Sequence, residues 1–468
     1  MRFQTKLVSF VETDDKILAT VQDSLSAHEY QIRAKYLLGA DGARSTVVKQ
    51  LGIPLISAMN ADDRIMVNVM VRADLTHLME HRQGDLHFVL QPEKDGFDPD
   101  LKAMSIVRMV KPWHEWMFIL MSKPGFDPRA AHVTTNMNYY LPMVNQLIGD
   151  GTPAEIFHVA HWYMNETVAQ HYSTESRNTF ILGDAAHRHP PGAGLGSNTC
   201  IQDAYNLAWK LAYVEKGIAG PSLLDTYSIE RQPVGQAIVK RANDAMRNQL
   251  PLYQTLGITF GPQQGNPEAL AQLASPTPLG AETRIRLREA IASSKIEFNG
   301  IGMEMGQLCA NSGGIYLADE TEPFELTGKA AEDPILYHQA STYPGRRLPH
   351  VWLNTAVPGR PISTIDLAGH GVFTLLTSHG GAPWKAAAET VGKQLGIEIR
   401  AYSIGFRLEW EDVYFDWSRV RGVEESGAIL VRPDRFVAWR AKGLPVVGGG
   451  TSACEDKLAK VMRSILGL

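Results

Sequence analysis

The segment NTFILGDAAHRHPPGAGLGSNTCIQDAYNLAWKLA, residues 178–212, decides the fold of this 468-residue chain. Its short apolar run at residues 179–182 predicts a buried strand, and the strand ends in Gly183 and Asp184. A loop rich in proline and glycine follows, and a long helical pattern begins after that loop. The segment therefore places a carboxylate, a flexible loop and a helix N-terminus in direct succession.

This succession of groups suits a ligand that combines hydroxyl groups with a flat ring. The Asp184 carboxylate can accept hydrogen bonds from the hydroxyls of a polyol. Gly192, Gly194 and Gly196 leave room for a ring to approach the backbone closely. The amides of residues 197–199 head the helix, where the positive end of the helix dipole favours an anionic ring edge.

The same residues allow interpretations without such a ligand. A glycine-rich connector with Ser197 or Asn198 as the helix cap is one, although a loop this rich in glycine is costly to order. His187 and His189 form an H-x-H pair, but no further ligands lie nearby at suitable spacing, so we predict no metal site. The run GAGLGS is not G-x-G-x-x-G and follows no βαβ pattern, so it is not a dinucleotide fingerprint.

A second segment, YLLGADGARSTVVKQLGI at residues 36–53, repeats the order of strand, glycine and carboxylate. The run KYLLGA at residues 35–40 is more uniformly apolar than the strands before it, which predicts a strand buried on both faces. Asp41 can bind a ligand hydroxyl, and Gly42 supplies positive φ, but Asp-Gly is also among the commonest turn dipeptides. Ser45 is the predicted N-cap of a short helix that Gly52 ends.

Composition restricts the class of protein further. Lys and Arg number 45 against 50 Asp and Glu, and this balance does not indicate a nucleic-acid partner. Cys200, Cys309 and Cys454 form no C-x-x-C motif, which favours a reducing, cytoplasmic compartment over a disulfide framework. No signal peptide and no apolar run of about 18 residues is present, so we expect no membrane association.

Alternating strands are predicted across residues 3–40 and again from about residue 62 to 122, before a helix at residues 139–148. Long helices are predicted at residues 197–217 and 223–250, then a surface connection at 261–282 and a helix at 283–298. Strands and helices alternate from about residue 344 onward, with a strand expected at 362–368. Gly217 is the predicted end of the first long helix. This helix has a predicted apolar stripe that comprises Ile201, Ala204, Leu207, Ala208, Leu211 and Ala212.

Taken together, the two glycine-carboxylate segments resemble those of the group A FAD-dependent aromatic monooxygenases, in particular the phenol and 2,4-dichlorophenol hydroxylase branch. The likeness extends over essentially the whole chain. Three further stretches contribute to it: LLDTYSIERQPVGQAIVKRAN at residues 223–243, VRMVKPWHEW at 107–116 and PGRRLPHVWL at 344–353.

The resemblance implies an α/β (α+β) architecture built on a partial FAD-binding fold of the p-hydroxybenzoate hydroxylase type. Residues 1–60 and 166–260 would form the FAD-binding domain, and residues 61–165 a β-sheet domain over the substrate. Residues 261–343 would be a helical linker. Residues 344–468 would form a thioredoxin-like C-terminal domain without redox cysteines.

The resemblance also assigns FAD contacts. Asp41, Gly42 and Ser45 would touch FAD from the first segment and be linked to the use of NAD(P)H. Gly183 and Asp184 would hold the ribityl chain. The adjoining loop and helix start complete the implied set of contacts: Ala185, Ala186, His187, Pro190, Gly196, Ser197 and Asn198.

The implied reaction belongs largely to the cofactor. NAD(P)H would reduce FAD, O₂ would add at flavin C4a, and the hydroperoxide would hydroxylate a phenolic ring. Arg108, His114 and Trp162 are candidates to face this substrate, although a structural ion pair or a packed aromatic ring explains each equally well. No catalytic residue is assigned, NADH and NADPH stay open, and a homodimer would fit the family.

The chain departs from the family at its start. The family begins with a βαβ unit carrying G-x-G-x-x-G for the FAD pyrophosphate, and no such motif occurs here. We therefore expect this sequence to begin inside the family pattern. Two alternatives follow from this departure: a non-catalytic scaffold or interaction protein with weak flavin affinity, and a redox-neutral isomerase or cyclase.

Overall fold

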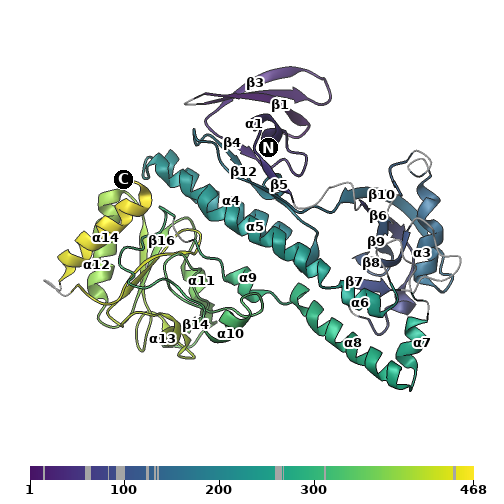
Figure 1. The fold of residues 1–468 in the computed structure, drawn as a ribbon. Coiled ribbons are helices and arrows are strands. Elements are labelled where there is room, and N and C mark those ends of the chain that lie inside the picture. Colours follow the sequence, from purple (N-terminus) through teal and green to yellow (C-terminus); the bar gives the residue numbers. More distant parts are fainter. Residues whose placement is uncertain are drawn as a thin grey trace.

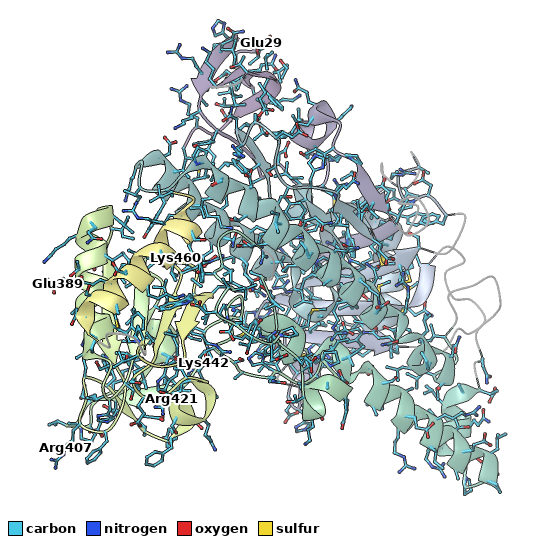
Figure 2. All side chains as sticks on the ribbon, turned by 60° about the vertical axis from the view of Figure 1, so that its left-hand side comes forward. Glu29, Glu389, Arg407, Arg421, Lys442 and Lys460 are labelled. Atoms are coloured by element: carbon cyan, nitrogen blue, oxygen red, sulfur yellow. The ribbon has the colours of Figure 1, made fainter. Side chains whose placement is uncertain are left out.

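The computed structural model describes residues 1–13, 16–57, 65–82, 84–90, 101–122, 126–130, 133, 136–258, 266, 268–309, 312–445 and 450–468, without the side chains of 102 and 103. Two long helices, α4 (Gly196–Glu215) and α5 (Asp225–Arg247), run through the middle of the molecule (Figure 1). Three strand-rich parts surround them. Charged side chains such as Glu29, Glu389 and Lys460 project from the outer surfaces of these parts (Figure 2).

The N-terminal part is an antiparallel sheet of β1 (Thr5–Glu12), β2 (Ile17–Asp23) and β3 (Glu29–Ala34), as predicted. The predicted turn at residues 14–15 lies outside the described residues. Strand β4 (Leu37–Gly39) follows and pairs in parallel with β12 (Thr179–Ile181). The prediction that β4 is buried on both faces is wrong, because Leu38 is 47% exposed on this two-stranded sheet.

The second part is a five-stranded antiparallel sheet in the order β10-β6-β9-β8-β7. Alternate residues of β6 point to opposite faces. Val67, Val69 and Val71 enter a core with helix α3 (Leu141–Ile148), whereas Met66 and Asn68 face the other way. The strands are β6 (Ile65–Arg72), β7 (Leu86–Leu90), β8 (Leu101–Lys111), β9 (Glu115–Ser122) and β10 (Glu155–Tyr163).

Helix α4 begins and ends close to the predicted positions, and Gly217 at φ 70° follows it. Its predicted buried stripe is mostly wrong, since Ile201 is 67% exposed and Ala204, Ala208 and Ala212 are exposed as well. Polar groups take part of the buried face because they bond to one another and to distant segments. The buried side chains include Asp203, Asn206, Leu207, Trp209, Lys210 and Tyr213.

Beyond α5 the chain is mainly helical within the described residues. The predicted surface connection is partly wrong: part of residues 261–282 lies outside the description, and the rest contains α7 and the start of α8. The helices are α6 (Leu250–Thr255), α7 (Ala269–Ala274), α8 (Pro278–Ser294), α9 (Ile301–Met305) and α10 (Gly328–Glu332), with the 3₁₀ turn η7 (Lys295–Glu297).

The C-terminal part contains a four-stranded sheet in the order β17-β16-β19-β20. Helices α12 (Ala382–Leu395) and α14 (Thr451–Leu466) contribute to the core at this sheet, where Trp384 and Trp439 meet at 5.4 Å between ring centroids. The strands are β16 (Phe373–Thr377), β17 (Ile399–Ser403), β19 (Ala428–Val431) and β20 (Val437–Ala441).

Short elements complete the architecture. The strand predicted at residues 362–368 is only partly correct, because β15 turns at once into α11, where Ser363 and Asp366 form a capping box. Among the described residues no helix is long and apolar enough to cross a membrane. These elements are α1 (Thr46–Leu51), β5 (Leu55–Ser57), β11 (Thr167–Ala169), β13 (His187–Arg188), β14 (Trp352–Asn354), β15 (Ile362–Ser363), α11 (Thr364–Leu367), β18 (Glu411–Asp412) and α13 (Asp416–Val420).

Candidate functional site

The two predicted carboxylates follow neighbouring strands. Gly39 of β4 is the register partner of Ile181 of β12 in a parallel pair. Asp41 and Asp184 therefore both come after the carboxyl ends of adjacent parallel strands. In α/β sheets this edge is where ligands bind.

The carboxylate of Asp41 is occupied by its own loop. Its Oδ1 accepts a hydrogen bond from the Ser45 hydroxyl at 2.6 Å, and its Oδ2 accepts from the Thr46 amide at 2.7 Å. Ser45 in turn caps helix α1 by accepting from the Val48 amide, as predicted. Gly42 has φ 78°, which brings the chain back to the helix start. The structure thus gives Asp41 a capping role, and its contact with a cofactor stays a prediction.

The carboxylate of Asp184 is exposed, in contrast. Its side chain makes a weak contact with Cys200, whose thiol lies 3.9 Å from Oδ1. Burial and the nearby Asp184 charge raise the pKa of the Cys200 thiol to about 11, so the thiol is neutral. Ala185 and Ala186 are buried beneath the turn. Asp184 is therefore placed to accept hydrogen bonds from a ligand.

His187 is buried and supports the loop from inside. Its Nε2 lies 2.8 Å from Oδ2 of Asp203, and the same oxygen accepts a hydrogen bond from the Gly183 amide at 3.1 Å. Arg231 donates to the other oxygen of Asp203 at 2.8 Å. Burial raises the pKa of Asp203, but the His187 hydrogen bond and the Arg231 charge outweigh it and lower the pKa overall. Asp203 and Arg231 were not among the predicted site residues, and their charge within helical patterns was the available signal.

The glycine-rich loop leads to an open helix start. Within the described residues α4 has no side-chain cap, so neither Ser197 nor Asn198 acts as the cap that the connector interpretation requires. Asn198 Nδ2 instead donates to the Gly194 carbonyl at 2.9 Å. A Cβ atom at Gly194 would have no neighbour within 4 Å. The first amides of α4 are thus available to an acceptor group.

A cavity of about 300 Å³ lies between the five-stranded sheet and this loop. Its walls are mainly apolar, with Met66, Ile106 and Trp162 from the sheet and Pro190 from the loop. A wider cavity of about 850 Å³ shares Trp162 and extends to Asp184, Ser197 and Arg108. Glu297 of η7, which the sequence analysis did not single out, lines both cavities.

The three predicted substrate-facing residues do not all lie at the cavities. Trp162 faces both cavities, and its indole nitrogen donates to Asn68 Oδ1 at 2.9 Å. Arg108 lines the wider cavity. His114 lies elsewhere, in the β8–β9 turn, where its Nδ1 is 3.8 Å from Asp74. It therefore lines neither cavity and follows the alternative of a structural ion pair.

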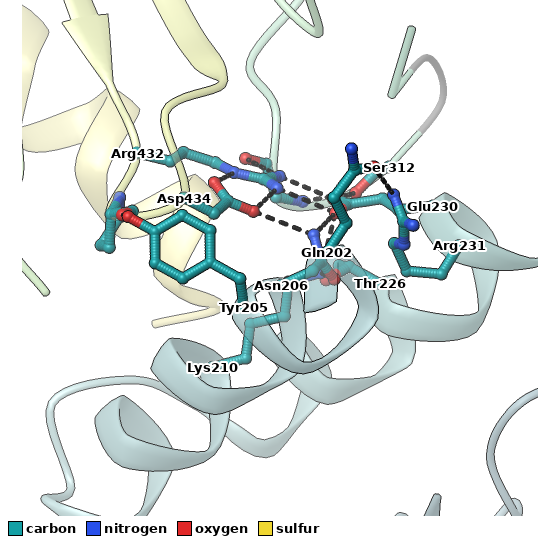
Figure 3. A network of polar contacts seen from close by, with 12 residues as sticks. Gln202, Tyr205, Asn206, Lys210, Thr226, Glu230, Arg231, Ser312, Arg432 and Asp434 are labelled. Atoms are coloured by element: carbon teal, nitrogen blue, oxygen red, sulfur yellow. Dashed lines mark hydrogen bonds and ion pairs between the residues drawn. The ribbon is translucent and has the colours of Figure 1, made fainter. Parts of the chain in front are cut away.

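A buried ionic network connects the helices to the C-terminal part (Figure 3). The Glu230 carboxylate accepts from Lys210 at 2.8 Å and from both terminal nitrogens of Arg432, at 2.6 and 2.9 Å. Arg432 also donates to Asp434 at 2.6 Å. Burial raises the pKa of Glu230, but the Arg432 and Lys210 charges lower it well below its usual range. Among the described residues no cluster of three or more His, Cys, Asp or Glu could hold a metal.

Comparison with known families matches both ends of the chain. Residues 1–242 match the FAD binding domain model, and residues 341–468 match the aromatic-ring hydroxylase C-terminal model. The 2,4-dichlorophenol 6-monooxygenase of Delftia acidovorans is 40% identical over 444 residues, which cover 94% of this chain and 72% of the relative. The phenol 2-monooxygenase of Pseudomonas sp. (strain EST1001) is 38% identical over 449 residues, covering 95% of this chain and 68% of that protein.

Solved structures agree with these matches. The flavin-dependent monooxygenase PieE, crystallised with FAD and substrate, superposes with a TM-score of 0.83 at 34% identity, covering 100% of this chain and 76% of PieE. Aklavinone-11 hydroxylase with FAD and aklavinone gives a TM-score of 0.73 at 27% identity, covering 100% of this chain and 74% of that enzyme.

Proposed function

Because this chain belongs to the FAD-dependent aromatic-ring hydroxylases, a family of monooxygenases, we propose that it hydroxylates a phenolic ring held beneath its five-stranded sheet. The observation that carries the proposal is the apolar cavity of about 300 Å³ against the glycine-rich loop. Apolar walls with a few polar groups suit a small aromatic molecule.

FAD is the cofactor of this family, and the residues of this chain fit it. The exposed Asp184 carboxylate would accept hydrogen bonds from ribityl hydroxyls, and the uncapped amides at Ser197 and Asn198 would meet an acceptor edge of the ring. Asp41, Gly42 and Ser45 would contact FAD as a preformed loop, since the Asp41 carboxylate already bonds within it.

When bound, FAD supplies the redox chemistry: NAD(P)H, as is usual in the family, reduces it, and it activates O₂ to place one oxygen atom on the ring. The protein's part is positioning and exclusion of water. Trp162, fixed by Asn68, would pack on the substrate ring, and the methionines of the sheet face would keep the cavity apolar. His187 and Asp203 would hold the loop in place from below.

The test is turnover by the FAD-loaded protein. Phenol should increase the rate of NAD(P)H oxidation, and product formed under ¹⁸O₂ should carry one heavy oxygen atom on the ring. Faster NAD(P)H oxidation without a hydroxylated product from any phenol tried would contradict the proposal.

The domain plan is likewise a proposal. The mixed sheet with α12 and α14 supports a thioredoxin-like unit at residues 344–468, and the hydroxylase C-terminal match at 341–468 has nearly the same bounds. The β4–β12 pairing supports joining residues 1–60 with 166–260 in one FAD-binding domain. The separate sheet of β6–β10 supports a substrate domain at 61–165.

A further inference from the structure

Glu297 lines both cavities beside the glycine-rich loop. It lies in η7, more than 100 residues after the glycine-rich loop in the sequence. A Cβ atom built on Gly192 would be 3.9 Å from its Oε1. Glu297 is the only ionisable side chain, among the described residues, that lines both cavities; the others common to both are Phe88, Ile106, Ile119, Trp162, Pro191 and Gly192.

One oxygen of this carboxylate is buried without a hydrogen bond. Oε2 of Glu297 has no partner among the described residues, although a buried acceptor left unpaired costs about 1–3 kcal/mol. Burial raises the pKa of Glu297, and the Arg241 charge opposes this only in part. The Arg241 guanidinium makes no hydrogen bond to Glu297, since all three of its nitrogens are unpaired in the described structure.

Two donors that line the apolar cavity are committed elsewhere, whereas Ser122 on the sheet face is unpaired in the described structure. The Trp162 indole nitrogen donates to Asn68. Arg247, which also lines the apolar cavity, pairs with Glu166 and Asp244. Apart from the committed Trp162 indole, the side chains that line both cavities with Glu297 are apolar, so a ligand hydroxyl can supply the hydrogen that its carboxylate lacks.

We infer that Glu297 accepts the hydroxyl hydrogen of the ring substrate and thereby selects aromatic substrates that carry a free hydroxyl. This inference rests on the proposed function, since it assumes a phenolic ring in the cavity. Glu297 is then a specificity-determining residue, contributed from outside both glycine-carboxylate segments. A ring lacking the donor would leave the buried carboxylate unpaired, and this penalty is what discriminates against it.

The experiment compares binding of phenol and of anisole, its methyl ether, to the FAD-loaded protein without NAD(P)H. Calorimetry gives the two dissociation constants with no turnover. Wild type should bind phenol about tenfold or more tightly than anisole, the size expected for a hydrogen bond to a charged group. Glu297→Leu should bring this ratio close to one, whereas Glu297→Gln, whose amide oxygen still accepts, should keep most of it.

Glu304→Leu is the matched control. Glu304 lies on α9 near Arg241 but is exposed and lines neither cavity, so its variant should keep the wild-type ratio. A wild-type ratio retained in Glu297→Leu overturns the inference and leaves the proposed function standing. Failure of wild type to bind either ring overturns both the inference and the proposed function. A lower melting temperature in Glu297→Leu would show that Glu297 has a structural role and would also count against the inference.

Discussion

Nε2 of His187 lies 2.8 Å from Oδ2 of Asp203, and both side chains are almost fully buried. The same carboxylate binds the Gly183 amide and Arg231, so one residue of α4 holds the turn that carries Asp184. The position of the loop thus depends on a carboxylate that is itself fully buried. The first two predictions concern this residue.

Asp203→Asn should destabilise the protein by about 3 kcal/mol, because it leaves the buried Arg231 guanidinium without its counter-charge. Chemical denaturation measures this loss of unfolding free energy. Asp225→Asn is the control, since the Asp225–Arg177 ion pair is about 40% exposed and should contribute about 1 kcal/mol or less. Equal losses in the two variants would refute the special role of Asp203.

The stabilising effect of Asp203 should also depend on pH. Its folded-state pKa is lowered, so the stability that it contributes is present above its unfolded pKa, about 4, and is lost as the pH falls through the lower folded value. His187 and Arg231 are the basic side chains that face it. The difference in unfolding free energy between wild type and Asp203→Asn should therefore shrink below about pH 4, and a constant difference would contradict this.

Asp184→Asn and Asp41→Asn should affect different properties of the protein, FAD affinity in the first case and thermal stability in the second. The Asp184 variant should lose about tenfold or more in FAD affinity with an unchanged melting temperature of the ligand-free protein, since a charged acceptor for the ligand is lost. The Asp41 variant should lower that melting temperature, because a cap such as this contributes about 1 kcal/mol. Flavin titration and thermal unfolding of both variants distinguish the two roles.

Glu230→Met and Arg432→Met should each destabilise the chain by about 3 kcal/mol or more, because each leaves buried charges without partners. The double variant should lose less than the sum of the two, by at least about 1 kcal/mol, since the two residues are in direct contact. Denaturation of all four proteins completes the cycle. Additive losses would mean that the pair does not couple the helices to the C-terminal part.

Gly235→Ala should destabilise the protein although alanine favours helices. A Cβ atom at Gly235 would lie 2.0 Å from the Tyr172 hydroxyl and 3.2 Å from the His187 ring, which leaves no room for it. Gly217→Ala is no suitable comparison, because its φ is positive, but Gly359→Ala is open and has no such φ. A melting temperature below that of Gly359→Ala is the expected result.

Local patterns in the sequence were sufficient for most elements. Alternation located β1–β3 and four strands of the five-stranded sheet, and Ser45 and Gly52 located the ends of α1, because these signals act over a few residues. Strand β10 of that sheet was not predicted. The buried face of α4 was not predictable in this way. Lys210 and Asn206 are buried only because Glu230 and Asp434 arrive from distant segments.

The site was predictable to a similar extent. Asp184 and the uncapped start of α4 were visible as a motif, since they follow a strand in direct succession. Glu297 carried no motif, and only the packing of η7 against the loop brings it to the cavity. For His114 the sequence left a substrate contact and a structural ion pair equally open, and the fold decides between them by placing it in a turn beside Asp74.

The network around Glu230 also bears on the order in which the chain assembles. Glu230 and Arg432 are 202 residues apart, a delay of roughly 10–40 s at a ribosome adding about 5–20 residues per second. Lys210 and Glu230 belong to neighbouring helices made early, and Arg432 and Asp434 to one late turn, so each side can neutralise its own charge while it waits. Docking then adds the Arg432–Glu230 contact to two pairs that are already neutral, and both of those pairs persist in the folded chain.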